Sequence, residues 1–126
     1  MPKTVPSSPE IVPGRYPFSE VVEANGYVFL AGQVGDRPGM PGAVPGGIAA
    51  ETRAMLDNVG RLLRAVALDY PDVVRCTVYL RDFSEFGAMN MVYREYFPTE
   101  PPTRATVGVT ALAEDFRVEI EVLAAR

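Results

Sequence analysis

Two charged side chains near the C-terminus have the types and spacing to do chemistry together. Arg104 stands in the segment 102–107, and Glu119 follows in the segment 118–122. A guanidinium can bind a carboxylate through two parallel hydrogen bonds, and a carboxylate can hold and deprotonate a water molecule. The pair therefore suits a small anionic substrate that reacts with water.

Both residues lie in short apolar runs that alternate as β-strands do. In the run 104–109, Arg104 and Thr106 share one face because successive strand side chains point to opposite sides. In the run 117–124, Glu119 faces away from the apolar positions. We expect Arg104, Thr106 and Glu119 to share the polar face of one sheet, where a guanidinium and a carboxylate would flank a small cavity.

The elements that position these strands follow from periodicity and turn residues. Asn25 and Gly26 between two β-rich runs are a strong hairpin signal, and the glycine- and proline-rich segment 36–47 is an irregular loop. Apolar residues at helical spacing predict two amphipathic helices, and Asp82 with Glu85 resembles a capping box at the second. The expected order is strands 19–23 and 27–31, helix 48–68, strand 73–80, helix 83–97, and strands 104–109 and 117–124.

The 126 residues form a single domain of the α+β class, with residues 1–15 as a loose, proline-broken lead-in. Two helices can cover only one face of a mixed sheet, so the other face stays uncovered. We expect that face to carry aromatic and polar side chains together, namely Arg104, Thr106, Glu119, Tyr27, Phe29, Thr77 and Tyr79. Such a mixture is typical of a subunit interface, and it predicts an oligomer with binding clefts between subunits.

Composition excludes several kinds of function. The net charge of −4 argues against a nucleic-acid partner, and the absence of histidine removes Ser-His and Cys-His nucleophile pairs and histidine-ligated metal sites. The one cysteine, Cys76, alternates with apolar residues in 73–80 and is interpreted as core. With no disulfide framework, signal peptide or membrane anchor in the sequence, we expect a cytoplasmic protein that does not bind membranes.

A set of residues spread along the chain is similar to one known family. The set comprises Gly14, Tyr16, Ala31-Gly32-Gln33, Leu56-Asp57-Asn58-Val59, Asn90, Tyr93, Phe97, Pro102-Thr103-Arg104 and Val118-Glu119-Ile120-Glu121. In this combination the chain resembles the RidA (YjgF-type) imine deaminases from Gly14 to Ala125. The resemblance implies a homotrimer with a fold like Bacillus chorismate mutase and small acids bound between subunits. It also implies hydrolysis of 2-imino acids, such as the tautomer of 2-aminoacrylate, to 2-oxo acids and ammonia, without cofactor or metal.

The resemblance assigns roles to individual positions. Arg104 matches the arginine that binds the substrate carboxylate, and Glu119 matches the acid that holds the attacking water. Tyr16 matches a tyrosine at the cleft, and Gly32 a backbone contact to the ligand. Ala105 and Thr106, which follow the arginine, complete the expected substrate-binding set.

The chain departs from the family pattern at three places. Thr106 stands where many relatives have cysteine, so thiol-dependent behaviour should be absent. Ala31 replaces a serine that many relatives carry, and Gly35 replaces a common proline. These changes leave the substrate preference more open than the reaction class.

Other interpretations remain open on sequence grounds. Endoribonuclease activity is attributed to some relatives, but an acidic chain without histidine lacks the usual phosphate contacts and acid–base pair. A non-catalytic sensor of 2-oxo acids would use Arg104 equally well, so only Glu119 argues for turnover. Asn58 and Asn90 are expected in helices, where they would bond to neighbouring backbone or stabilise a trimer.

Overall fold

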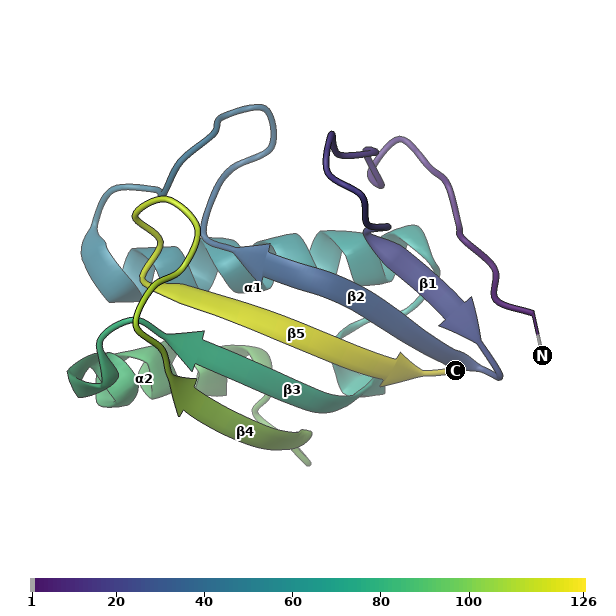
Figure 1. Cartoon of the computed structure of the whole chain (residues 1–126). Coiled ribbons are helices and arrows are strands. Elements are labelled where there is room, and N and C mark those ends of the chain that lie inside the picture. The colour runs from purple at the N-terminus through teal and green to yellow at the C-terminus, as the bar shows by residue number, and fades with distance from the viewer. Residues whose placement is uncertain (1) are drawn as a thin grey trace.

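The computed structural model describes residues 2–126 and contains a five-stranded mixed sheet with both helices behind it (Figure 1). This arrangement confirms the predicted α+β class and the covering of one sheet face. Two short 3-10 turns, Tyr70–Asp72 and Phe83–Glu85, precede β3 and α2 respectively. The elements are β1 (Val21–Ala24), β2 (Tyr27–Val34), α1 (Gly47–Ala65), β3 (Val73–Leu80), α2 (Phe86–Tyr96), β4 (Thr103–Gly108) and β5 (Val118–Ala125).

The strands lie in the order β1-β2-β5-β3-β4. β3 and β4 are parallel and are joined through α2, whereas every other neighbouring pair is antiparallel. The C-terminal strand β5 therefore occupies the centre of the sheet, and β4 forms one edge. Within residues 2–126, none of the helices has the length and apolarity that a bilayer crossing requires.

The hairpin predicted at Asn25 and Gly26 is present between β1 and β2. Both residues adopt left-handed backbone angles, with φ of 53° and 79°, which is the conformation that tight two-residue hairpin turns need. β2 continues to Val34, beyond the predicted end at residue 31. That extension matters because the added residues belong to a pocket described below.

The core lies between the sheet and the two helices. Cys76 is fully buried there, as predicted, and burial raises the pKa of its thiol to about 11. One detail of β3 differs from the predicted alternation. A register irregularity between Val73 and Arg75 turns Val73 into the core and leaves Val74 exposed, although Val74 was expected on the buried face.

The N-terminal segment is held to the fold at two points, in contrast to the expected loose lead-in. Thr4 and Glu23 exchange backbone hydrogen bonds of 2.8 Å in each direction, which extends the sheet beyond β1. Ile11 is buried in the core. Apolar burial of one side chain and a pair of sheet hydrogen bonds are enough to order a proline-rich segment.

The second helix begins differently from the predicted capping box. Asp82 does cap the 3-10 turn Phe83–Glu85, because its carboxylate accepts a hydrogen bond from Ser84 N at 3.0 Å. Glu85, the expected partner in the box, instead accepts from Arg117 Nη1 at 2.8 Å. The α-helix itself starts at Phe86, later than the predicted residue 83.

Candidate active site in two halves

Arg104 and Glu119 lie on opposite faces of the sheet. Arg104 pairs with Cys76 across the parallel ladder, and Cys76 is buried beneath the helices. Glu119 pairs with Tyr79, which is three positions from Cys76 and so points to the uncovered face. The prediction that the guanidinium and the carboxylate share one polar face within a chain is wrong.

Thr106 needs the same correction, since it pairs with the buried Val78 and lies on the helix-covered face with Arg104. Alternation shows which residues of a strand share a face, but not which face receives a helix. On the edge strand β4 the polar face is covered by α2, and the apolar face with Val107 is left partly exposed. The other members predicted for the uncovered face are found there, with Tyr27 and Phe29 each 47% exposed.

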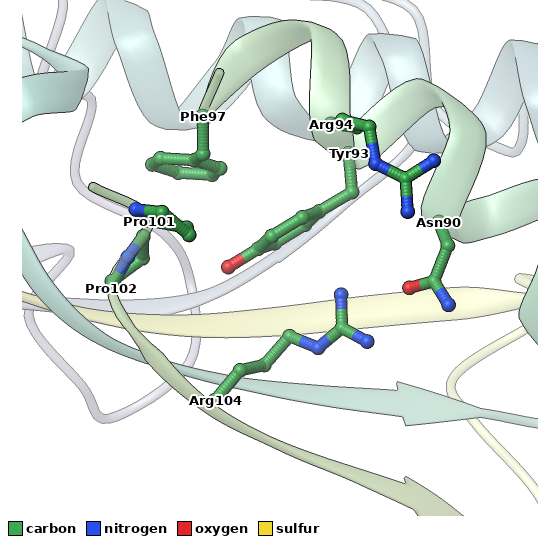
Figure 2. Close-up of a pocket in the computed structure, with 7 residues that line it drawn as sticks. All are labelled: Asn90, Tyr93, Arg94, Phe97, Pro101, Pro102 and Arg104. Atoms are coloured by element: carbon green, nitrogen blue, oxygen red, sulfur yellow. The ribbon is translucent and has the colours of Figure 1, made fainter. Parts of the chain in front are cut away.

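The Arg104 guanidinium rests on aromatic rings between β4 and α2 (Figure 2). Its central carbon lies 4.6 Å from the centroid of the Tyr93 ring and 5.6 Å from that of Phe86. The ion pairs formed within residues 2–126 all belong to other arginines. A pocket of about 280 Å³, called here the Arg104 pocket, is lined by Asn90, Tyr93, Arg94, Phe97, Pro101, Pro102 and Arg104.

Two buried polar atoms of the Arg104 pocket are also without partners. Asn90 Oδ1 and Tyr93 Oη have no hydrogen-bond partner among residues 2–126. Tyr93 Oη lies next to the Cys76 thiol and the Arg104 guanidinium, which both influence the pKa of its hydroxyl. The pocket offers what a small anion requires, namely a guanidinium that is fixed on aromatic rings and forms no ion pair within residues 2–126.

The second half of the site lies on the uncovered face around Glu119. This Glu119 pocket has a volume of about 580 Å³ and draws on the N-terminal segment, β2 and β5. Tyr16 and Phe18 form exposed aromatic parts of its wall. The full lining is Tyr16, Phe18, Glu20, Ala31, Gly32, Gln33, Val34, Asp36, Ala113 and Glu119.

A β-bulge and a glycine make the space for the Glu119 carboxylate. β2 pairs Leu30 with Val122 but Gln33 with Ile120, so β2 holds one extra residue at this point. A Cβ atom on Gly32 would stand 3.0 Å from Glu119 Cδ and still closer to Oε2. A side chain at this position would push the Glu119 carboxylate out of its present place. Gly32 therefore acts through the room that it leaves for the acid, in addition to any contact with a ligand.

The surroundings of Glu119 favour its protonated form. Burial raises the pKa of its carboxyl, and the nearby charge of Glu121 raises it further. Glu121 itself accepts a hydrogen bond from the Tyr79 hydroxyl. A carboxylate with an elevated pKa is a stronger proton acceptor than an ordinary one, which suits it to general acid–base work.

Side chains of α1 hold the end of β2 that carries this pocket. Asn58 Nδ2 donates to Val34 O at 2.8 Å, to Asp36 O at 3.1 Å and to Asp36 Oδ1 at 2.9 Å. This confirms the backbone role considered for Asn58. Gly35 touches α1 so closely that a Cβ would lie 2.5 Å from Glu51 O. The position requires glycine for packing.

The predicted site residues thus divide into groups. Tyr16, Gly32 and Glu119 come together in one pocket, while Arg104 stands in the other. Ala105 and Thr106 line neither of the two.

Sequence reasoning missed the part that Tyr93 plays beneath the guanidinium, because its helical spacing predicted an ordinary core residue. It also missed the support of Gln33, whose Nε2 donates to Glu20 Oε2 at 2.9 Å and to Ala31 O at 3.0 Å. The signal for Gln33 was its place in the Ala31-Gly32-Gln33 motif.

Comparison with known families decides the relationship. The pattern described as Endoribonuclease L-PSP matches residues 11–126. The chain belongs to this family. A 2-iminobutanoate/2-iminopropanoate deaminase from Mus musculus is 40% identical over 108 residues, which cover 86% of this chain and 80% of the mouse protein.

Solved structures agree with that assignment. YyfA from Yersinia pestis, described as a protein of the conserved Rid family, superimposes with a TM-score of 0.90 at 29% identity, covering 99% of this chain and 100% of that one. TdcF from E. coli, solved with bound serine, gives a TM-score of 0.84 at 31% identity, covering 94% and 96%. The resemblance to RidA (YjgF-type) proteins is therefore confirmed, and so is the mixed-sheet fold.

Proposed function

We propose that this chain is an imine deaminase that hydrolyses 2-imino acids to 2-oxo acids and ammonia. The observation that carries the proposal is the pair of complementary half-sites, an unpaired guanidinium at Arg104 and a carboxyl of elevated pKa at Glu119. Relatives that bear the name 2-iminobutanoate/2-iminopropanoate deaminase support it. Arg104 binds the substrate carboxylate, and Glu119 handles the water.

The reaction balances with these groups alone. Glu119 accepts a proton from water as the water oxygen bonds to the carbon of a protonated imine, and the C=N electrons move to nitrogen. The proton returns from Glu119 to that nitrogen, ammonia leaves, and the hydroxyl becomes the new carbonyl as its proton passes to the ammonia. A positioned acid–base group of this kind contributes roughly 10² to 10⁴ in rate. Fixing the carboxylate on Arg104 supplies the proximity.

Because the two groups lie on opposite faces of one sheet, a ligand that touches both must lie between two chains. We propose a homotrimer, arranged as in Bacillus chorismate mutase, in which the Arg104 pocket of one subunit faces the Glu119 pocket of the next. The exposed aromatic side chains of the uncovered face support an interface there. Tyr16, Ala105 and Thr106 would complete the substrate contacts. A cytoplasmic location and the absence of nucleic-acid or membrane partners stay predictions of the sequence.

The direct test generates an imine in place with an amino acid oxidase and adds semicarbazide as a competing trap. The protein should accelerate release of the 2-oxo acid and so reduce semicarbazone formation. Glu119→Gln should impair turnover more than binding of pyruvate, whereas Arg104→Ala should impair both. Pyruvate binding without turnover would favour the sensor, and cleavage of RNA with the imine untouched would favour the ribonuclease.

A mixing experiment tests the shared site. Arg104→Ala and Glu119→Gln subunits are each inactive alone in this scheme, but a mixed trimer contains interfaces with both native side chains. Equal mixing after unfolding and refolding should restore roughly a quarter of the wild-type activity. At each interface, the chance that one subunit supplies a native Arg104 is about one half, and so is the chance that the other supplies a native Glu119. Each variant refolded alone is the control. No recovery in a verified mixed trimer would show that one site does not span two chains.

A further inference from the structure

A second guanidinium faces the Arg104 pocket. Arg94 lies in the last turn of α2 and lines the same cavity as Arg104. Figure 2 shows the two guanidinium groups turned toward the same space, with the Asn90 amide at its edge. The proposed deamination uses only one of these two cations.

Arg94 has no acidic neighbour to neutralise it within residues 2–126. Its neighbour in sequence, Glu95, is engaged by Arg53, with Arg53 Nη1 at 2.9 Å from Glu95 Oε1. The remaining ion pairs of the described residues involve Arg64, Arg117 and Arg126. Arg94 is exposed to solvent, and both it and Arg104 line the same cavity without an acidic partner among the described residues. A ligand with two negative groups could therefore accept hydrogen bonds from both guanidinium groups.

The cavity is small and walled on one side. Its volume of about 280 Å³ within one chain lies just below the usual range of small-molecule sites, roughly 300 to 1,000 Å³. Phe97, Pro101 and Pro102 close it on the side away from Asn90 (Figure 2). These walls bound the end of the proposed site that would hold the carboxylates.

We infer that the preferred substrates are short 2-imino dicarboxylic acids, such as the imines formed by oxidation of aspartate or glutamate, with Arg94 binding the distal carboxylate. This inference rests on the proposed function and extends it to a substrate class. Arg104 still binds the carboxylate next to the imine carbon. Water adds at that carbon and ammonia leaves as before, while the distal carboxylate takes no part in the bond changes.

The test compares two imines in the same trapping assay. Flavin amino acid oxidases supply one imine from L-aspartate or L-glutamate and the other from L-alanine. Arg94→Met removes the charge and keeps most of the side chain, and it should lower kcat/KM for the dicarboxylic imine roughly 10- to 100-fold, the usual worth of a charged hydrogen bond. The value for the alanine-derived imine should not change. Arg94→Lys should recover part of the loss.

The matched control is Arg64→Met, which changes an exposed arginine in the last turn of α1, outside both pockets. This variant should leave kcat/KM unchanged for both imines. Equal losses for both imines in Arg94→Met, or no loss, would overturn the inference and leave deamination standing.

Binding gives a readout that is independent of turnover. Calorimetric titration should show that Arg94→Met weakens the binding of 2-oxoglutarate and leaves the binding of pyruvate unchanged. An unchanged Tm would show that the variant is folded. If the wild-type protein deaminates neither imine, the proposed function fails, and this titration still decides the role of Arg94. Equal affinity of wild type and Arg94→Met for 2-oxoglutarate would refute it.

Discussion

The Arg104 pocket and the Glu119 pocket are built by different means. In the Arg104 pocket, the aromatic rings of Tyr93 and Phe86 hold a long side chain in place, and a helix supplies both rings. In the Glu119 pocket, a bulged strand and Gly32 remove bulk so that a carboxylate can lie half-buried. The first construction fixes a positive charge, as the proposed role of Arg104 in binding a carboxylate requires. The second weakens the solvation of an acid, which prepares it to exchange protons.

The largest expected effect comes from changing the shape of the cation while keeping its charge. Arg104→Lys should lower kcat/KM for imine hydrolysis roughly 100-fold, because an ammonium can neither form two parallel hydrogen bonds to a carboxylate nor lie flat over Tyr93. Steady-state kinetics with the trapping assay measures the loss. A lysine variant with full activity would mean that the positive charge alone, without two parallel hydrogen bonds, is sufficient for substrate binding in this pocket.

Filling the space beside the acid should have the next largest effect. Gly32→Ala places a methyl group against the Glu119 carboxylate and should lower kcat roughly 10- to 100-fold, since small displacements of a reacting group are costly. Pyruvate should still bind through Arg104.

The control is Gly87→Ala in α2, where a Cβ meets nothing within 4 Å. It should keep activity and stabilise the fold by about 0.5 to 1 kcal/mol, as alanine does in helices. If the Gly32 variant were as active as the Gly87 variant, the glycine would not be what makes room for Glu119.

A smaller effect should appear only in the pH profile. In the proposed mechanism Glu119 acts as a carboxylate, so activity should fall as pH drops through its pKa, which lies above the ordinary value of a glutamate. Glu121→Gln removes the neighbouring charge that contributes to this rise, and the acidic limb of kcat/KM should move to lower pH. The shift is measured by comparing kcat/KM of the wild type and the variant across the acidic pH range. A limb that stays in place would mean that burial alone sets the pKa.

The smallest effect is expected from thiol reagents. Cys76 is the one cysteine of the chain, and it is fully buried with a thiol pKa raised to about 11. Iodoacetamide should leave the native protein active and unmodified at neutral pH. Mass spectrometry after treatment, with and without denaturant, checks this, and rapid native labelling would contradict the buried position.

Much of this fold was predictable from residue patterns alone. The β-branched run predicted β3 at residues 73–80, its observed bounds, and Asn25 with Gly26 predicted the hairpin. Local sequence determines these features, because pleat alternation and positive φ angles depend on the residues themselves.

The placement of Arg104 could not be predicted in this way. Arg104 and Thr106 make one face of β4 polar and Val107 lies on the other, so alternation favoured an uncovered polar face, whereas α2 packs on that face. The bulge in β2 was equally hidden, since the need for Gly32 arises from contact with a strand far along the chain. Family resemblance identified these residues as important, but their geometry depends on how strands and helices pack.

The separation of the two charges by the thickness of a sheet has a consequence for how activity depends on protein concentration. A single chain can present the guanidinium or the carboxylate to a given small molecule, and never both. Specific activity in the proposed scheme must therefore fall on dilution below the dissociation constant of the assembly, even while every chain remains folded. In that scheme the number of complete sites equals the number of subunit contacts, and a closed ring would leave no half-site without a partner.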